Sequence, residues 1–301
     1  MPSYHSPLRY PGGKRKLANF VKLLLRANRL LDGEYAEVYA GGAAVAMDLL
    51  LGRYVARVHI NDYDPGIAAF WSAVVEDTND LCDAINGVPV SVDEWERQRD
   101  VHERLQAGEN VPRLDAALAT FFLNRANRSG IISGGIIGGK DQTGEWGIKA
   151  RFNKQPLIER IKRIGRERTR ISVTQMDGED FLLKVAPSLP AKSLTYLDPP
   201  YFVKGQQMLY ANYYKPGDHA AVANIVANLE SPWMVSYDDV RDIRELYSSF
   251  RSKEYDISYS AQDRYRGREV AFFANGLSIP EVKDPSRLKD RLFRQLELEV
   301  A

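Results

Sequence analysis

Short apolar strands alternate with helical segments along this chain, and the alternation is interrupted once. Residues 35–39 and 56–60 have the composition of strands, and helical patterns follow over residues 43–51 and 66–75. A strand-helix-strand-helix order favours a parallel sheet that is covered by helices. We therefore expect an α/β fold that binds its ligands at the carboxyl ends of the strands.

The alternation resumes at residue 171 and continues almost to the end of the chain. Five further strands are predicted, at residues 171–174, 193–197, 233–237, 255–259 and 269–274. Only a short polar segment joins the last two, whereas a parallel crossover needs about a dozen residues. The sheet is therefore predicted to be Rossmann-like and mostly parallel, with an antiparallel edge strand.

Residues 79–167 interrupt this pattern with helices and a glycine-rich stretch, residues 129–147, which predicts a mobile loop or a hairpin tip. Residues 140–170 carry ten Lys and Arg against four Asp and Glu, a local charge of +6 in a chain of net charge +1. Such a segment either binds a polyanion or is a solvated charged helix. We expect three units: an inserted, mainly helical domain at 79–167, an α/β domain at 1–78 and 168–280, and a carboxyl-terminal helix packed on the body at 281–301.

The composition excludes several classes of protein. A hydrophobic content of 44% is enough for a large core, and no apolar run is long enough to cross a membrane. The single cysteine, Cys82, excludes a disulfide framework and a cysteine-built zinc site, and we expect no metal cofactor. The amino terminus lacks the layout of a signal peptide, so a cytoplasmic protein with no membrane partner is expected.

The segment Tyr196 to Tyr201 carries the most informative chemistry. A buried strand delivers the carboxylate of Asp198, then Pro199 and Pro200, and then the ring of Tyr201 to its carboxyl end. The prolines have no backbone N–H, so carbonyl groups beside them are left as free acceptors. Asp198 and one such carbonyl suit the two hydrogens of an amino group, and Tyr201 suits stacking on an aromatic base. Taken alone, the segment also fits a surface Asp-Pro-Pro turn.

Asp198 to Tyr201 resembles the Asp-Pro-Pro-Tyr motif of DNA adenine methyltransferases. Other segments resemble motifs of the Dam-like (alpha) group of these enzymes, in the same order along the chain. They are Tyr10-Pro11-Gly12-Gly13-Lys14, Glu37 to Ala44, Asn61-Asp62, Leu123-Asn124-Arg125 with Gly130, Ala150 to Asn153, and Asp180-Phe181. The resemblance covers residues 10–274, and several independent motifs in one order argue against chance.

The resemblance implies a catalytic site of Asp198, Pro199, Pro200 and Tyr201. It also implies that S-adenosylmethionine is bound by Tyr10, Lys14, Tyr39, Ala40, Gly41, Gly42, Asp62, Asp180, Phe181 and Asp198. Asp62 is expected at the ribose, and Asp180 with Phe181 beside the adenine of the cofactor. Simpler alternatives are a phosphate loop at 12–14, a tight turn at 41–42 and a helix cap at Asp62. Ala43 replaces the usual second glycine of the loop, which leaves room for a different loop conformation.

The inserted domain is implied to recognise double-stranded DNA. Phosphate contacts position a protein on DNA before bases are read. The predicted DNA-binding residues are Arg9, Asn124, Arg125, Arg128, Lys140, Arg151, Asn153, Lys154, Arg264, Arg266 and Arg268. Around Arg128 and in the glycine-rich stretch the sequence departs from the pattern of the group, so no recognition sequence is predicted.

The resemblance therefore implies a site-specific DNA adenine methyltransferase that flips its target base out of the duplex. A methyl group would pass from S-adenosylmethionine to the exocyclic amino group of adenine, leaving S-adenosylhomocysteine. A cognate restriction enzyme is a candidate protein partner. Two other interpretations stay open: methylation of RNA, of the cytosine amino group or of a protein amide, and a non-catalytic DNA-binding relative. Aspartate at position 198 favours adenine over cytosine, and the basic inserted domain favours nucleic acid over protein.

Overall fold

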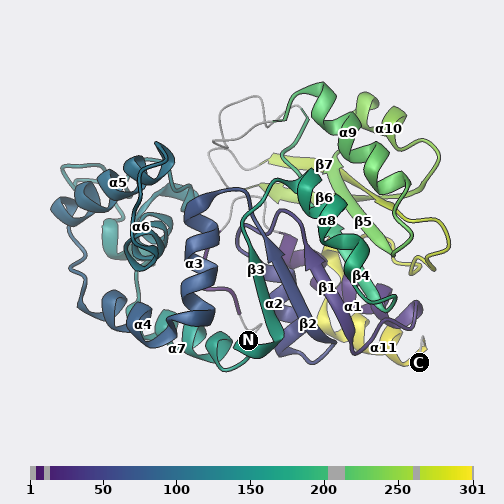
Figure 1. Cartoon of the computed structure of the whole chain (residues 1–301), viewed down its shortest axis with the longest axis horizontal. Helices are drawn as coiled ribbons and strands as arrows, with labels where there is room; N and C mark the ends of the chain where they lie inside the picture. Colours follow the sequence, from purple (N-terminus) through teal and green to yellow (C-terminus); the bar gives the residue numbers. More distant parts are fainter. Residues whose placement is uncertain (1–4, 10–13, 203–213, 260–264, 300–301) are drawn as a thin grey trace.

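The structure is a computed structural model that describes residues 5–9, 14–202, 214–259 and 265–299; the side chains of 257–259, 265–266 and 299 are outside this description. One sheet of seven strands occupies the α/β part of the molecule, and a group of helices lies to one side of it (Figure 1).

The sheet has the strand order β3-β2-β1-β4-β5-β7-β6. Its strands are β1 (Gly33–Glu37), β2 (Val55–Asn61), β3 (Ile171–Thr174), β4 (Ser193–Leu197), β5 (Trp233–Asp238), β6 (Arg251–Tyr259) and β7 (Tyr265–Phe273). Neighbouring strands are parallel from β3 to β5, whereas β7 runs antiparallel to both β5 and β6. The prediction of a mostly parallel, Rossmann-like sheet with an antiparallel edge is confirmed.

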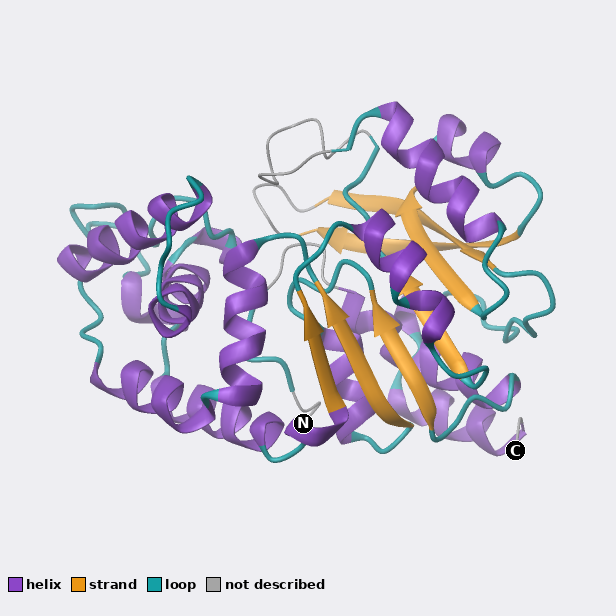
Figure 2. Cartoon of the chain, viewed as in Figure 1, coloured by secondary structure: helices purple, strands orange, loops and turns teal. Residues whose placement is uncertain are grey.

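The central strands are covered on both faces. Every residue of β4 and β5 is buried, and β1 buries all of its residues except Glu34. Strands that are buried on both faces have apolar runs without alternation, as Trp233-Met234-Val235 at the start of β5 shows. Helices α8 and α9 lie in front of the sheet, and α1 and α2 lie behind it (Figures 1 and 2).

The helices of the α/β part connect consecutive strands or close its ends. They are α1 (Ala18–Ala27), α2 (Ala44–Leu51), α3 (Pro65–Glu76), α8 (Gly178–Lys184), α9 (Pro216–Ala227), α10 (Arg241–Leu246) and α11 (Asp290–Glu299), with the short 3-10 helices η1 (Lys14–Leu17), η5 (Ala186–Ser188) and η7 (Pro285–Arg287). Asp64 caps α3 by accepting hydrogen bonds from the backbone N–H groups of Gly66 at 2.8 Å and Ile67 at 3.0 Å. The last helix, α11, packs against α1.

A group of helices separates α3 from β3 along the chain and forms the left side of Figure 1. It consists of α4 (Thr78–Gly87), α5 (Val92–Gln106), α6 (Arg113–Ala126), α7 (Lys154–Gly165), η2 (Arg128–Gly130), η3 (Ile148–Arg151) and η4 (Arg168–Arg170). We call these elements the helical region. Its main contact with the α/β part is α3, which packs on α6 and α7; Phe70 of α3 stacks on Phe121 of α6 with ring centroids 6.0 Å apart.

The glycine-rich stretch folds back on itself. Asn127 forms an isolated antiparallel bridge with Ile136, and the side chain of Gln142 holds the following turn. Its Nε2 donates to the carbonyl oxygens of Ile137 at 2.9 Å and Gly139 at 2.6 Å, and its Oε1 accepts from the N–H of Ile148 in η3 at 2.8 Å. Of the two sequence predictions for this stretch, the structure thus resembles the hairpin tip.

None of the helices in the described ranges combines the length and the apolar character that a membrane span requires.

Candidate active site

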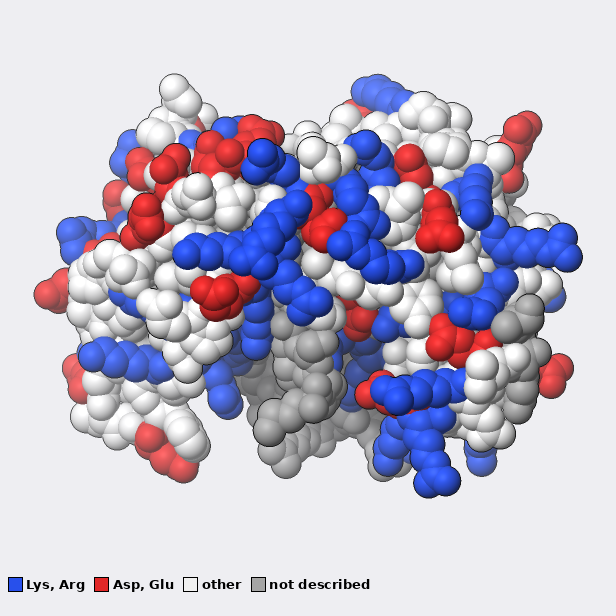
Figure 3. All heavy atoms as spheres, turned by 90° about the horizontal axis from the view of Figure 1, so that it is seen from below, with Lys and Arg blue, Asp and Glu red and all other residues white. Residues whose placement is uncertain are grey.

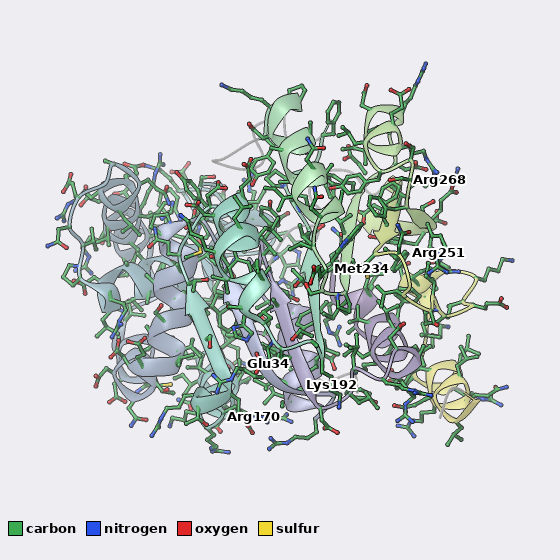
Figure 4. All side chains as sticks on the ribbon, turned by 45° about the vertical axis from the view of Figure 1, so that its right-hand side comes forward. Glu34, Arg170, Lys192, Met234, Arg251 and Arg268 are labelled. Atoms are coloured by element: carbon green, nitrogen blue, oxygen red, sulfur yellow. The ribbon has the colours of Figure 1, made fainter. Side chains whose placement is uncertain are left out.

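The predicted site residues follow three neighbouring strands at one edge of the sheet. Gly41 follows β1, Asp62 follows β2 and Asp198 follows β4. These strands are parallel neighbours, so their carboxyl ends lie side by side (Figure 2). Glu34 and Lys192, near the beginnings of β1 and β4, mark the opposite edge (Figure 4). The carboxyl edge therefore gathers chemistry that is far apart in the sequence.

The loop after β1 is tied to the residue that follows β2. The backbone N–H of Gly41 donates to Asp62 Oδ2 at 2.7 Å, and Trp71 Nε1 donates to the carbonyl oxygen of Gly41 at 2.8 Å. Gly41 has a φ of +47°, a conformation that favours glycine. The predicted cofactor loop and the predicted ribose carboxylate are thus in direct contact.

Ala43 adopts the left-handed conformation that a glycine tolerates. Its φ is +43° and its ψ is +39°, and it stands immediately before α2. This conformation costs an L-residue about 1–2 kcal/mol. The substitution of the usual glycine by alanine therefore leaves a glycine-type turn that carries backbone strain.

Asp62 is a partly buried carboxylate with an unusual proton affinity. Burial and the neighbouring charge of Asp64 raise the pKa of Asp62 to about 7, although hydrogen bonds from the N–H groups of Asp64 and Gly41 oppose the shift. The next residue, Tyr63, has 55% of its surface exposed. A carboxylate acceptor beside an open aromatic ring suits a ligand that combines hydroxyl groups with a flat apolar ring.

Asn61 joins the ends of three strands. Its amide nitrogen donates to the carbonyl oxygens of Val38 at 2.9 Å and Met176 at 3.0 Å, and its oxygen accepts from the hydroxyl of Thr174 at 2.8 Å. Asn61 is completely buried. Its role is to hold the loops after β1 and β3 beside the end of β2.

Glu37, the last residue of β1, is also buried. Its Oε1 accepts from the N–H of Ala46 in the first turn of α2 at 3.0 Å and from the hydroxyl of Tyr35 at 3.1 Å. Burial raises the pKa of Glu37 to about 8 despite these two hydrogen bonds. The contact orients α2 relative to the predicted cofactor loop.

Asp198 is held from two sides. Lys14 Nζ lies 2.8 Å from Asp198 Oδ1 and 2.9 Å from Oδ2, and the hydroxyl of Ser236 donates to Oδ1 at 2.9 Å. The hydroxyl of Tyr196 lies 2.7 Å from that of Ser236. Burial is the main cause that raises the pKa of Asp198, and the ion pair with Lys14 opposes it. The Asp198 side chain stays 22% exposed, so the carboxylate is fixed but accessible.

Tyr201 differs from the sequence expectation. Only 5% of it is exposed, and its hydroxyl contacts Lys14 Nζ at 2.5 Å and donates to Glu269 Oε1. Lys14 Nζ also lies 4.8 Å from the centroid of the Tyr201 ring. The buried side chains of Lys14 and Glu269 bind the Tyr201 hydroxyl, so in this arrangement the ring is not accessible for stacking on a base.

The remaining predicted cofactor residues differ in their exposure and in their partners. Tyr39 is half-buried, and its hydroxyl lies 3.0 Å from that of Tyr214. Phe181 is completely buried, and Asp180 pairs with Lys184 one turn along α8 at 2.8 Å. Ala40 lies in the loop between β1 and α2 with Gly41 and Gly42, whereas Tyr10 lies outside the described residues.

The sequence analysis missed four residues at this edge: Ser236, Glu269, Tyr63 and Asp177. Asp177 caps α8 immediately after β3, closer to the strand end than Asp180, by accepting from the N–H of Glu179 at 2.8 Å. Ser236 interrupts the apolar start of β5, and that contrast marks it in the sequence, whereas Glu269 follows Arg266 and Arg268 in β7 and no local pattern distinguishes it.

Asn124 has a structural role instead of the predicted contact with DNA. It is completely buried, and its oxygen accepts from the N–H of Arg9 at 2.8 Å. Its nitrogen donates to the carbonyl oxygens of Arg9 at 2.6 Å and Gly130 at 2.8 Å. The amide therefore pins the amino-terminal segment to the end of α6.

Three of the predicted DNA-binding arginines gather around the same segment. Arg125 donates to the carbonyl oxygens of Arg151 at 2.9 Å and Pro7 at 3.3 Å, and Arg9 donates to Asn127 at 3.4 Å. Burial lowers the pKa of Arg125 to about 9, with further lowering by the charges of Arg9, Arg160 and Arg151. We call Arg9, Arg125, Arg151 and Arg160 the arginine cluster.

Other predicted DNA contacts have protein partners. Lys154 donates to the carbonyl oxygen of Asn86 at 2.7 Å and also to that of Val88, and Lys140 pairs with Glu96 at 2.8 Å. Arg128 and Asn153 are exposed on the helical region. Arg264 and the side chain of Arg266 lie outside the described residues.

Arg268 lies on the far side of the α/β part from the helical region, as Figure 4 shows, and pairs with Glu254 at 3.6 Å.

Much of the basic charge of residues 140–170 lies at the edge where the parallel strands begin. Figure 3, a view from below, shows Lys and Arg side chains across the middle of that face. Helix α7 lies at the bottom of Figure 1, and η4 directly precedes the start of β3 along the chain. The exposed basic residues at the end of α7 and in η4 are Lys162, Arg163, Arg166 and Arg168. They are therefore separated from the carboxyl edge by the length of the sheet.

Across the described ranges, no group of three or more His, Cys, Asp and Glu residues is arranged to hold a metal ion.

This sheet, with a glycine loop after β1, an acid after β2 and Asp-Pro-Pro-Tyr after β4, is a Rossmann-like methyltransferase fold. Residues 10–260 match the sequence model of the D12 class N6 adenine-specific DNA methyltransferases, and the chain belongs to this family. It is thus an enzyme that methylates adenine in DNA, and the family implies S-adenosylmethionine as the methyl donor. This assignment agrees with the sequence prediction rather than with its alternatives.

Among solved structures, the chain is similar to the rRNA methyltransferase aviRa from Streptomyces viridochromogenes, with 14% sequence identity and a TM-score of 0.40 over 88% of this chain and 86% of that one. No curated protein sequence matches the chain.

Proposed function

We propose that this enzyme methylates adenine within a specific site of double-stranded DNA, with Asp198 and the backbone carbonyl of Pro199 accepting the two hydrogens of the target amino group. The observation that carries the proposal is the fixed, 22% exposed carboxylate of Asp198 at the end of β4. Two hydrogen bonds of this kind shift the nitrogen lone pair away from the purine ring, which makes the nitrogen more nucleophilic.

The residues of the carboxyl edge fit the methyl donor. Asp62 is an acceptor for the ribose hydroxyl groups, Gly41 and Gly42 carry no side chains that would block approach, and Tyr63 offers an exposed ring to the adenine of the donor. When bound, S-adenosylmethionine supplies an electrophilic methyl group on a sulfonium. The contacts of Lys14 with Asp198 and Tyr201 support a role at the catalytic carboxylate rather than at the donor.

The reaction requires alignment more than covalent chemistry. The amino nitrogen forms a bond to the methyl carbon while the carbon–sulfur bond breaks and its electron pair goes to sulfur. The nitrogen then releases one hydrogen as a proton, for which Asp198 is the nearest base in this proposal. Flipping the base out of the duplex costs a few kcal/mol of lost stacking.

DNA binding is assigned to the arginine cluster and to exposed residues of the helical region, Arg128 and Asn153. The mutual repulsion within the arginine cluster supports this assignment, because a phosphate would relieve it. We further propose that the enzyme acts in the cytoplasm, because its substrate is DNA, and that a restriction enzyme with the same recognition site is its partner.

Purified protein, S-adenosylmethionine and unmethylated genomic DNA, followed by mass spectrometry of the nucleosides, test the proposal. We expect N6-methyladenine, and we expect Asp198→Ala to lower kcat by roughly 10²–10⁴-fold while the donor still binds. Sequencing of the product for methylated adenines gives the recognition site. An Asp198→Ala variant with wild-type kcat would falsify the assignment of the carboxylate.

A further inference from the structure

Glu269 is a buried carboxylate that touches the catalytic segment from strand β7, and the sequence analysis gave it no role. It lies on β7, none of its surface is exposed, and its Oε1 accepts from the hydroxyl of Tyr201. Its Oε2 lies 3.6 Å from Lys14 Nζ, the same ammonium that holds Asp198. Lys14 is therefore shared between the carboxylates of Asp198 and Glu269, which lie 71 residues apart in the sequence.

The sharing decides the net charge of the site. Lys14, Asp198 and Glu269 together carry one positive and two negative charges when all are ionised, a net charge of −1. Burying a carboxylate costs desolvation free energy, and the contacts of Glu269 with Lys14 and Tyr201 offset part of that cost. If Lys14 were paired with Asp198 alone, the pair would be neutral, and the carboxylate of Asp198 would be a weaker acceptor for an amino hydrogen.

The charge of Glu269 also affects how well Asp198 accepts a hydrogen bond. The charge of Glu269 raises the pKa of Asp198, which makes that carboxylate a stronger acceptor for an amino hydrogen. Across the sheet, Glu269 is paired with Asp238 of β5, whose Oδ1 accepts from the N–H of Phe202 at 3.0 Å. Strand β7, which carries Glu269, therefore pairs with the part of β5 whose Asp238 holds Phe202, the residue directly after the tetrapeptide.

We propose that Glu269 is a positioning residue that keeps the group of Lys14, Asp198 and Glu269 net negative and so stabilises the positive charge that develops on the amino nitrogen during methyl transfer. The proposal rests on the proposed role of Asp198. It assigns to Glu269 an effect on kcat that passes through the charge of Lys14, and no contact with DNA or with the methyl donor.

The test uses the dependence of one substitution on the background in which it is made. In the wild type, Glu269→Gln takes the charge of the cluster of Lys14, Asp198 and Glu269 from −1 to neutral, and kcat at saturating donor and DNA should fall roughly 10- to 100-fold. In a Lys14→Met background the cluster starts at −2, and the same substitution returns it to −1. There, Glu269→Gln should change kcat by less than about twofold, because Asp198 alone then keeps the site net negative. A fall by the same factor in both backgrounds, or a change below twofold in the wild type, overturns the proposal.

A second comparison keeps the test decisive if Lys14→Met does not fold. Glu269→Asp keeps the charge but shortens the side chain, whereas Glu269→Gln keeps the length but removes the charge. The proposal requires the Asp variant to retain more activity than the Gln variant; the reverse order means that packing alone explains Glu269.

Donor affinity by calorimetry and cooperative unfolding are measured for each variant first. A wild type that does not methylate DNA, or an active Asp198→Ala variant, contradicts the proposed function and is seen before any variant of Glu269 is made.

Discussion

Asp62 carries the charge at the carboxyl edge that is most sensitive to pH near neutrality. Its pKa is raised to about 7, and its Oδ2 also holds the loop through Gly41. A ribose hydroxyl donates to the ionised carboxylate, so donor binding should weaken as the pH falls and Asp62 takes up a proton. Between pH 8 and pH 6 we expect the affinity for S-adenosylmethionine to fall by about tenfold, measured by calorimetry.

The Asp62→Asn variant separates this effect from the titration of the donor itself. It should bind more weakly than the wild type at pH 8 and should lose the tenfold dependence attributed to Asp62. An unchanged pH dependence in this variant would assign the effect to another group, and Glu37, with a pKa near 8, would be the next one to replace.

Ala43 allows a test of backbone strain in the same loop. Glycine at this position relieves the left-handed conformation, which offsets the loss of the buried methyl group and the greater freedom of the unfolded chain. We expect Ala43→Gly to change the free energy of unfolding by less than about 0.5 kcal/mol or to raise it. The matched control, Ala46→Gly in α2, should lower it by about 1–2 kcal/mol because that residue is helical and buried. Equal losses at the two positions in denaturant unfolding would rule out the strain.

Among the elements, the strands were predictable and their order was not. Residues 35–37 and 193–197 are buried, whereas 56–60 alternates between the buried Val58 and Ile60 and the less buried Arg57 and His59; both patterns are local and can be read from the sequence. The position of β7 between β5 and β6 depends on pairing across the sheet, for which its own residues carry no local pattern. Glu269 was missed for the same reason: a single acid in a strand reads as solvent-facing until its partners are known.

Asn124 shows a signal that was present but outweighed by a motif. Ala117, Phe121 and Asn124 follow the helical spacing of one face, and that face of α6 is buried. The resemblance indicated a functional asparagine, whereas its position on the inner face indicated a packed one. The predicted carboxyl-edge residues Asp62 and Asp198 were easier to identify, because a polar residue directly after a buried strand has no packing role to perform.

The contact between α6 and the amino-terminal segment depends on that asparagine. Asn124→Ala removes three hydrogen bonds and leaves buried backbone groups of Arg9 and Gly130 without this partner. We expect a loss of about 2–3 kcal/mol in the free energy of unfolding. Asn228→Ala, which removes a single exposed bond to Asn224, should change it by less than about 0.5 kcal/mol. A loss at Asn124 no larger than at Asn228, measured by urea unfolding, would contradict the pinning role.

In the whole molecule, the basic charge is distributed over two opposite edges of the sheet, and net charge does not reveal which edge meets DNA. The candidate site requires DNA at the carboxyl edge. Arg166 stands at the end of α7 on the other side, and Lys154 is engaged by the carbonyl groups at the end of α4. Among the residues counted in the basic segment, Arg151 is the exposed member of the arginine cluster.

The salt dependence of DNA binding distinguishes these positions. A phosphate contact contributes about 0.9 to the slope of log K against log salt concentration, because it displaces about one counterion. Arg151→Gln should therefore lower the slope by about 0.9 and weaken binding to all sequences, as measured by fluorescence anisotropy on a duplex. Lys154→Gln and Arg166→Gln remove the same charge from the same segment and should leave the slope unchanged. Equal reductions for all three variants would mean that diffuse charge, and not a located phosphate contact, attracts the DNA. A reduction for Arg166 alone would place the DNA at the edge where the parallel strands begin, on the side of the molecule away from Asp198.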